Sequence, residues 1–141
     1  MTNSNERHRL SLIIATLGPS TDNEKELITM LMAGIARQWT DGVDIARILH
    51  SDGEDIARNR IDVFRSQSKK RNLSTQIYLD TDSENIDIEQ YINFANSVGP
   101  DIATFPKSIG IENFSKLKDN LNPEIKISLR LKNSDSLDDL E

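Results

Sequence analysis

Charged and hydroxyl side chains directly follow apolar segments of this chain, where they could do chemistry. Arg47, Asp80, Lys107 and Arg130 each stand at or just after the end of such a segment. Guanidinium and ammonium groups can hold a phosphate or a carboxylate, while carboxylate and hydroxyl oxygens can hold a cation. Ligands of α/β proteins collect where parallel strands end and helices begin, so this edge of a sheet could hold a cation and a phosphate together.

Five apolar segments have the character of strands, and segments with helical spacing lie between them. The expected strands are 11–16, 43–49, 76–79, 101–105 and 124–131. The expected helices are one capped by Ser20 or Thr21, then 54–70, 88–97 and 111–120, and a short one over 136–140. Strands that alternate with helices form parallel sheets, because parallel neighbours need a crossover. We therefore expect an α/β fold of about five βα units, in a single domain over 1–141 with a disordered tail at 1–9.

The first expected strand has consecutive apolar residues from Leu12 to Ala15. A strand with one wet face would alternate, so we expect this one to be covered on both faces. Gly18 and Pro19 end it, and Thr21 with Glu24 forms a Thr-x-x-Glu capping box for the next helix.

The helix over 54–70 has apolar residues at the spacing of a buried stripe. Ile56, Ala57, Ile61 and Phe64 occupy these positions. We expect all four side chains to pack against the sheet.

Composition narrows the class of protein. The chain has 141 residues, a net charge of −6 and no cysteine, which excludes a disulfide framework and any cysteine-based metal site. Its basic residues are scattered and its aromatics are few, so we expect no nucleic-acid partner. The first residues contain no secretory signal and no run is long enough to span a membrane, so we expect a cytoplasmic protein with no membrane partner.

Five motifs resemble, in order, those of the pyruvate kinase family. The stretch IIATLGPST resembles the family's first strand and loop, GVDIARILHSDG resembles G-x-D-x-A-R-x-N-F-S-H-G, and IYLDTDS resembles L-L-D-T-K-G-P. Further on, GPDIATFPKS and IKISLRLKNSDSLDDLE resemble two later strands with their loops. The resemblance implies the N-terminal half of a TIM-type barrel, without the lid domain that the family inserts after its third strand.

The resemblance also implies roles for individual residues. Arg47 falls on the family's phosphate-binding arginine, and Thr16, Gly18 and Pro19 fall on the loop beside the nucleotide. The ligands of the family's monovalent cation correspond to Ser51, Asp80 and Thr81. Lys107 adds positive charge to the same edge, and we place it with the phosphate-binding residues. Each of these residues also has a purely structural interpretation; Arg47, for example, could simply pair with a carboxylate.

Three departures from the family pattern concern the chemistry. The family's cofactors are K⁺ and Mg²⁺, and its catalytic lysine and metal-binding glutamate correspond here to Arg130 and Lys132. An arginine can still hold a phosphate, but an ammonium group has no lone pair and cannot ligate Mg²⁺. Leu49 also replaces an asparagine of the potassium shell. We therefore expect no divalent metal site, and no pyruvate kinase activity from this chain alone.

Three functional hypotheses remain open. The first is a pyruvate-kinase-like binding, regulatory or assembly component that keeps part of an anion site. The second is a small enzyme with different chemistry, in which His50 and Asp52 act as acid and base while Arg47 and Arg130 clamp a phosphorylated or carboxylate substrate. The third, ranked last, is a receiver-like phosphoacceptor with Asp80 or Asp82 as acceptor, and with Thr104 and Lys132 after the next two strands.

Five βα units cannot close an eight-stranded barrel, which usually needs about 250 residues. The first and fifth strands of a partial barrel would keep unpaired backbone groups. Either the strands rearrange into an open, doubly wound sheet or copies of the chain cover one another. We expect a homodimer or a higher homo-oligomer.

Overall fold

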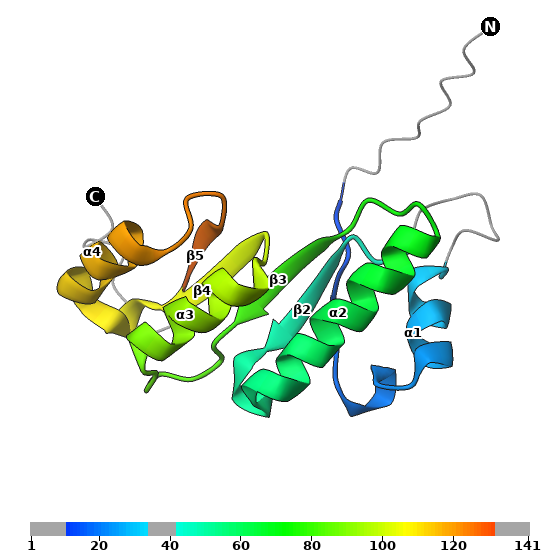
Figure 1. The fold of residues 1–141 in the computed structure, drawn as a ribbon, viewed down its shortest axis with the longest axis horizontal. Coiled ribbons are helices and arrows are strands. Elements are labelled where there is room, and N and C mark those ends of the chain that lie inside the picture. Colours follow the sequence, from blue (N-terminus) through cyan, green and yellow to red (C-terminus); the bar gives the residue numbers. More distant parts are fainter. Residues whose placement is uncertain (1–10, 34–41, 132–141) are drawn as a thin grey trace, which may run out of the picture.

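Five parallel strands form one open sheet in the computed structural model, which describes residues 11–33 and 42–131. The strands are β1 (Ile14–Thr16), β2 (Ile45–Leu49), β3 (Gln76–Asp80), β4 (Ile102–Pro106) and β5 (Lys126–Arg130), and they lie in sequential order (Figure 1). Each neighbouring pair is parallel. The expected α/β class with about five βα units is confirmed. The sequential order differs from the doubly wound alternative, in which the strand order reverses.

The described residues form four α-helices, which lie on one face of this sheet (Figure 1). They are α1 (Glu24–Leu31), α2 (Glu54–Lys70), α3 (Ile88–Val98) and α4 (Gly110–Asn120), with short 3₁₀ turns η1 (Pro19–Thr21), η3 (His50–Asp52) and η4 (Lys107–Ile109). Crossovers between parallel strands are right-handed, so a sequential strand order places every helix on the same face. Figure 1 shows the helices in front of the sheet, each packed beside the next.

The core lies between these helices and the sheet. Alternate strand residues such as Ala46, Ile48, Leu79 and Phe105 point to the helices and are fully buried. The other strand residues point to the opposite side, which we call the far face. By strand alternation and register, the far face carries Ile14, Thr16, Ile45, Arg47, Leu49, Gln76, Tyr78, Asp80, Ile102, Thr104, Pro106, Lys126, Ser128 and Arg130.

The start of α1 differs from the prediction. The helix begins at Glu24, and its cap is Asn23, whose side chain accepts a hydrogen bond from the Lys25 backbone N–H at 2.8 Å. The Thr21 hydroxyl instead lies 2.9 Å from both the N–H and the carbonyl oxygen of Gly18. The expected cap at Ser20 or Thr21, and the capping box with Glu24, are therefore wrong, because the η1 turn uses Thr21 before the helix begins.

The first strand also differs from the prediction. Only Ile14–Thr16 form β1, and the side chains of Leu12, Ile13 and Ile14 are 66%, 45% and 56% exposed. The expectation that this strand is covered on both faces is wrong for a single copy of the chain. The physical reason is that β1 is an edge strand and that the described helices cover only one face.

One expected core position of α2 is also wrong. Ile56 is exposed, while the buried stripe of the helix runs through Ala57, Arg60, Ile61 and Phe64. Arg60 takes the place in the stripe that an apolar residue would normally fill.

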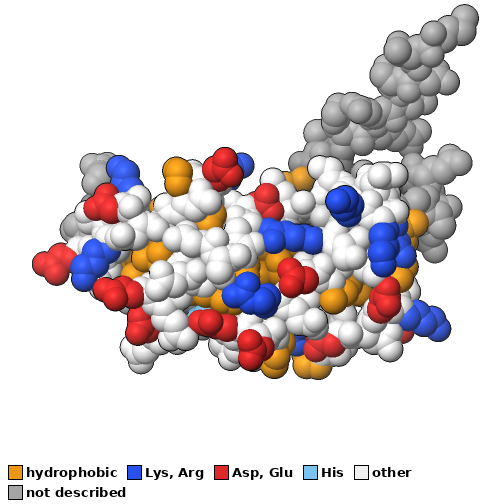
Figure 2. All heavy atoms as spheres, in the orientation of Figure 1, with side chains coloured by type: hydrophobic (Ala, Val, Ile, Leu, Met, Phe, Trp, Pro, Cys, Tyr) orange, Lys and Arg blue, Asp and Glu red, His pale blue; other side chains and the backbone are white. Residues whose placement is uncertain are grey.

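Three predicted features lie outside the described residues: the tail at 1–9, the helix at 136–140, and Lys132. Within 11–33 and 42–131, no helix is long and apolar enough to cross a membrane. Figure 2 shows acidic and basic side chains interspersed over the visible, helix-covered face.

Candidate functional site

The carboxylate of Asp80 lies between two arginines at the carboxyl end of the sheet. Arg47 donates to Asp80 Oδ2 from Nε at 2.8 Å and from Nη2 at 2.6 Å, and its Nη1 donates to Thr16 Oγ1 at 3.2 Å. Arg130 Nη1 lies 3.6 Å from the other carboxylate oxygen, Oδ1. We call these four residues, Thr16, Arg47, Asp80 and Arg130, the Asp80 cluster. Four different strands bring its members to the far face.

Burial differs sharply within the Asp80 cluster. The Asp80 side chain is 4% exposed, whereas those of Arg47 and Arg130 are 34% and 28% exposed. Asp80 Oδ1 also accepts a hydrogen bond from the Asp82 backbone N–H at 3.0 Å. The carboxylate therefore holds two partly exposed guanidinium groups at one place.

Arg130 also reaches the loop after β3. Its Nη2 lies 3.3 Å from the Ser83 carbonyl oxygen and 3.4 Å from Glu84 Oε1. Glu84 Oε2 in turn accepts a hydrogen bond from the Ser108 hydroxyl at 2.7 Å. The contacts of Arg130 are all longer than the roughly 2.7–2.9 Å of a strong charge-assisted hydrogen bond.

The three expected cation ligands do not converge on one point. Asp80 is paired with arginines, and the Ser51 hydroxyl donates to Asp82 Oδ2 at 2.7 Å. Thr81 is fully buried, and its hydroxyl has no hydrogen-bond partner among the described residues. No group of three or more His, Asp or Glu side chains that could hold a metal occurs in 11–33 or 42–131. This donor set does not fit a potassium shell, so we derive no step through a cation.

The loop after β1 is fixed by backbone contacts. The Leu17 N–H donates to the Arg47 carbonyl oxygen at 2.9 Å, and the extended Gly18 leads into the η1 turn at Pro19. The loop begins at Leu17, directly after Thr16 of the Asp80 cluster. Lys107 opens the η4 turn after β4, at the same edge of the sheet.

His50 lies on the helix-covered side, away from the arginines of the Asp80 cluster. Its ring packs edge-on against Tyr91, with the ring centroids 5.0 Å apart, and against Phe94 at 5.4 Å. Its Nε2 is 3.7 Å from Glu54 Oε1. The structure therefore does not bring His50 together with Arg47 and Arg130, as the second hypothesis requires.

Asp52 is engaged by an arginine that the sequence analysis missed. Arg60, whose side chain is 5% exposed, forms a short ion pair with Asp52 and also binds Asp22, from Nε at 2.6 Å and from Nη2 at 3.0 Å. These contacts tie the loops after β1 and β2 to α2. A signal was present in the sequence, since an arginine in the buried stripe of a helix requires nearby carboxylates.

The pairing of Arg60 with Asp22 shifts the pKa values of both groups. The hydrogen bond from Arg60 lowers the pKa of Asp22 below its usual value, against an opposing effect of burial. The same contact, with that to Asp52, raises the pKa of the Arg60 guanidinium. Both groups therefore stay charged over the physiological range.

Tyr91 links α3 to two strands. Its fully buried hydroxyl lies 3.1 Å from the Leu79 carbonyl oxygen and 3.3 Å from that of Thr104. Burial is the main cause that raises the pKa of this phenol. The neutral hydroxyl thus anchors the backbone just before Asp80 and at the residue opposite it in β4.

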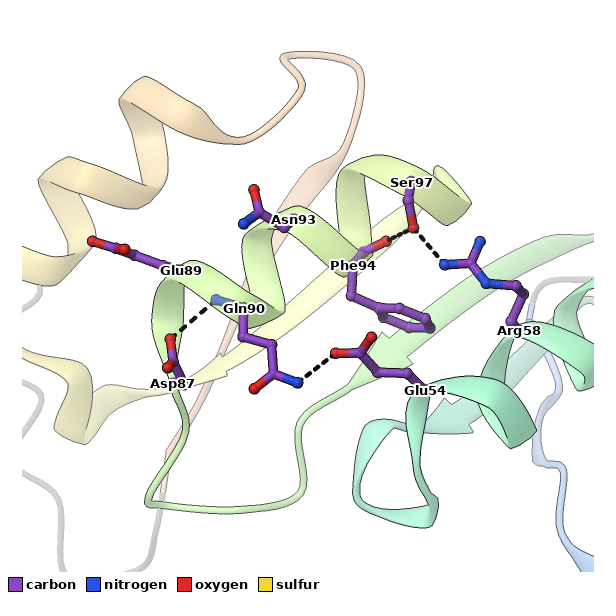
Figure 3. Close-up of a pocket in the computed structure, with 8 residues that line it drawn as sticks. All are labelled: Glu54, Arg58, Asp87, Glu89, Gln90, Asn93, Phe94 and Ser97. Atoms are coloured by element: carbon purple, nitrogen blue, oxygen red, sulfur yellow. Dashed lines mark hydrogen bonds between the residues drawn. The ribbon is translucent and has the colours of Figure 1, made fainter.

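A groove of about 480 Å³ runs between α2 and α3, and Figure 3 shows the eight residues that line it. Its polar groups largely satisfy one another: the Gln90 side chain donates to Glu54 at 2.8 Å, and Arg58 donates to Ser97 at 2.8 Å. None of the site residues expected from the sequence lines this groove.

A second cavity, of about 410 Å³, lies between the loops that follow β3 and β4. Its lining residues are Glu84, Asn85, Ile86, Ile88, Ser108, Ile109 and Asn113. Glu84, which contacts Arg130, connects this cavity to the Asp80 cluster.

No protein-family model matches the chain, and no curated protein is similar enough to count as a relative.

Proposed function

We propose that this chain is a pyruvate-kinase-like protein that binds a phosphorylated or carboxylate small molecule at the Asp80 cluster and does not transfer a phosphoryl group by itself. The observation that carries the proposal is the pair of partly exposed guanidinium groups held on either side of the buried Asp80 carboxylate. Planar guanidinium groups are the side chains best suited to two-point recognition of phosphate and carboxylate.

The Asp80 cluster has donors left for a ligand. Of the five N–H groups of a guanidinium, Asp80 and Thr16 use three on Arg47, which leaves two. The long contacts of Arg130 to Asp80 and Glu84 can give way to a shorter bond with a ligand anion. The cluster itself has two cations against one buried carboxylate, and the Glu84 carboxylate, 3.4 Å from Arg130, balances the second cation until a ligand anion displaces it.

The neighbouring cavity gives the rest of the ligand a place. It lies at the carboxyl ends of β3 and β4, the edge where α/β proteins bind small molecules. Its isoleucines and its hydroxyl and amide groups suit a small body with both apolar and hydrogen-bonding parts. Since Lys132 cannot ligate Mg²⁺, we expect binding without turnover.

Calorimetric titration with phosphoenolpyruvate, with and without Mg²⁺, tests this function. We expect binding that is independent of Mg²⁺ and that weakens at least about tenfold in Arg130→Met, because a hydrogen bond to a charged group contributes about 1.5–3 kcal/mol. Arg58→Met, which changes an arginine on the helix-covered side, is the matched control and should bind like the wild type. Production of pyruvate, or equal binding by Arg130→Met, would contradict the proposal.

A further inference from the structure

The exposed large apolar side chains of the described chain concentrate at the two edges of the sheet. Seven such residues are exposed, and five lie at the edges: Leu12, Ile13 and Ile14, which we call the β1 edge, and Ile127 and Leu131, which we call the β5 edge. Only Met32 and Ile56 lie elsewhere. An apolar strip along an edge strand is unusual, because proteins normally protect such edges with charge or cover.

The backbone at both edges has hydrogen-bonding capacity to spare. Within the described residues, β1 pairs only with β2 and β5 pairs only with β4. The outward N–H and C=O groups of an edge strand are a template for another strand. The apolar run from Leu12 to Ala15 is typical of a strand covered on both faces, and one copy of the chain leaves Leu12, Ile13 and Ile14 exposed.

A second copy of the chain offers what each edge lacks. The β1 edge needs a parallel, apolar strand on its open side, and the β5 edge is such a strand. For two copies to close on each other, the sheet must curve round its far face, as half of a (β/α) barrel does, so that both open sides turn the same way. A two-fold rotation about an axis along the strands keeps all strands parallel. It places β5 of the partner beside β1, and at the same time β1 of the partner beside β5.

Contact size favours this closed pair over an open chain of copies. β1 has three residues and β5 has five, so one pairing of these strands is at most about 17 Å long, whereas a specific interface buries about 800 Å² on each partner. The two-fold pair uses both edges of each copy and so doubles the contact. It also leaves no free edge, which an open chain would keep at each end.

We infer that two copies of this chain form a closed dimer through β1–β5 pairing between protomers. Light scattering at micromolar concentration should give twice the 15.9 kDa chain mass. Ile13→Lys should reduce this to the mass of one chain, because a buried ammonium group at the edge has no partner. Ile56→Lys is the matched control, because Ile56 is 47% exposed and Ile13 is 45% exposed. Ile56 lies on α2, away from both edges of the sheet, so the Ile56→Lys variant should remain a dimer.

The inference is overturned if the wild-type protein has the mass of one chain. It is also overturned if Ile13→Lys and Ile56→Lys reduce association equally. Ile127→Lys repeats the test at the other edge, so that a folding defect in one variant, checked by circular dichroism, does not decide the result.

Cross-linking tests which edges meet. The chain has no cysteine, so Ile13→Cys and Ile127→Cys introduce the only thiols, and alternation places both on the helix side of the sheet. With a short bismaleimide, the double variant should give covalent dimers that do not extend further, and either single variant should give none. A ladder of larger species, dimers from a single variant, or no cross-link at all would contradict β1–β5 pairing.

Discussion

Asp80 is a buried carboxylate that organises two arginines, and this gives the far face its chemistry. It pairs most closely with Arg47, one strand away, and contacts Arg130 from β5. A buried charge is tolerable only when it is paired and hydrogen-bonded, so the carboxylate and the guanidinium groups hold one another in place. At the residue scale, the anion site therefore depends on Asp80 as a positioning group.

Asp22 should make the protein sensitive to acid. Its pKa is lowered in the folded state by Arg60, so the stabilisation is present above the unfolded pKa of about 3.9 and is lost as pH falls toward the folded pKa. We expect Asp22→Asn to lower the free energy of unfolding at pH 7. Between pH 7 and pH 3, this variant should lose less of its free energy of unfolding than the wild type loses. Urea unfolding at both pH values measures these free energies. If the wild type and Asp22→Asn differ by the same amount at pH 3 as at pH 7, the role given to Arg60 is contradicted.

Thr104 should tolerate loss of its hydroxyl. The side chain is 1% exposed, and its Oγ1 has no hydrogen-bond partner among the described residues. Thr104→Val keeps the shape, so we expect stability to be unchanged or to rise by up to about 1 kcal/mol. The control is Thr16→Val, which removes the acceptor of a hydrogen bond from Arg47 and should not be stabilising. A loss above about 1 kcal/mol in Thr104→Val, measured by urea unfolding, would show that the hydroxyl is used.

At the scale of the elements, α2 and the turns around it fix the carboxyl edge of the sheet. Arg60 ties α2 to the loops after β1 and β2, and Tyr91 ties α3 to β3 and β4. These contacts lie on the helix-covered side, opposite the Asp80 cluster. The helices thus position the strand ends without occupying the far face.

The cap of α1 gives a prediction at this scale. Asn23→Ala should cost about 1 kcal/mol of stability, because its side chain satisfies an otherwise unpaired N–H in the first turn. Ser20→Ala, at the position first expected to cap the helix, should change stability by less than about 0.5 kcal/mol. Thermal unfolding of the two variants compares them, and a larger effect at Ser20 would contradict the observed start of the helix.

Periodicity in the sequence predicted the elements well and their contacts less well. The range 54–70 matches α2 residue for residue, because its apolar spacing and the glycine just before its first residue, Gly53, are local signals. The Arg60–Asp22 contact joins residues that are 38 positions apart in the sequence. A local sequence pattern cannot predict a contact between residues so far apart. The sequence analysis allowed that Arg47 pairs with a carboxylate but did not say which one. The strand register identifies the partner as Asp80.

At the scale of the whole molecule, the sequential strand order leaves one face of the sheet without helices from the described residues. That same order leaves two apolar edges and brings the Asp80 cluster to the far face. The exposure of Leu12 and Ile14 could not be foreseen from their apolar run, since the run itself is typical of a covered strand.

A dimer should make thermal stability depend on protein concentration. Association stabilises the folded chain by mass action, so the melting temperature of the wild type should rise between about 1 and 100 µM. The Ile13→Lys variant should show no such rise. Differential scanning fluorimetry over this range measures it, and an equal response in both proteins would contradict the edge pairing.

The most direct measurement of the central claim is the nuclear magnetic resonance signal of each arginine Nε–H during titration with phosphoenolpyruvate in the absence of Mg²⁺. Signals of Arg47 and Arg130 should shift and saturate together, while that of Arg60, held by Asp22 and Asp52, should not move. If the Arg47 and Arg130 signals do not shift, or shift only when Mg²⁺ is added, the Asp80 cluster is not the anion site that we propose.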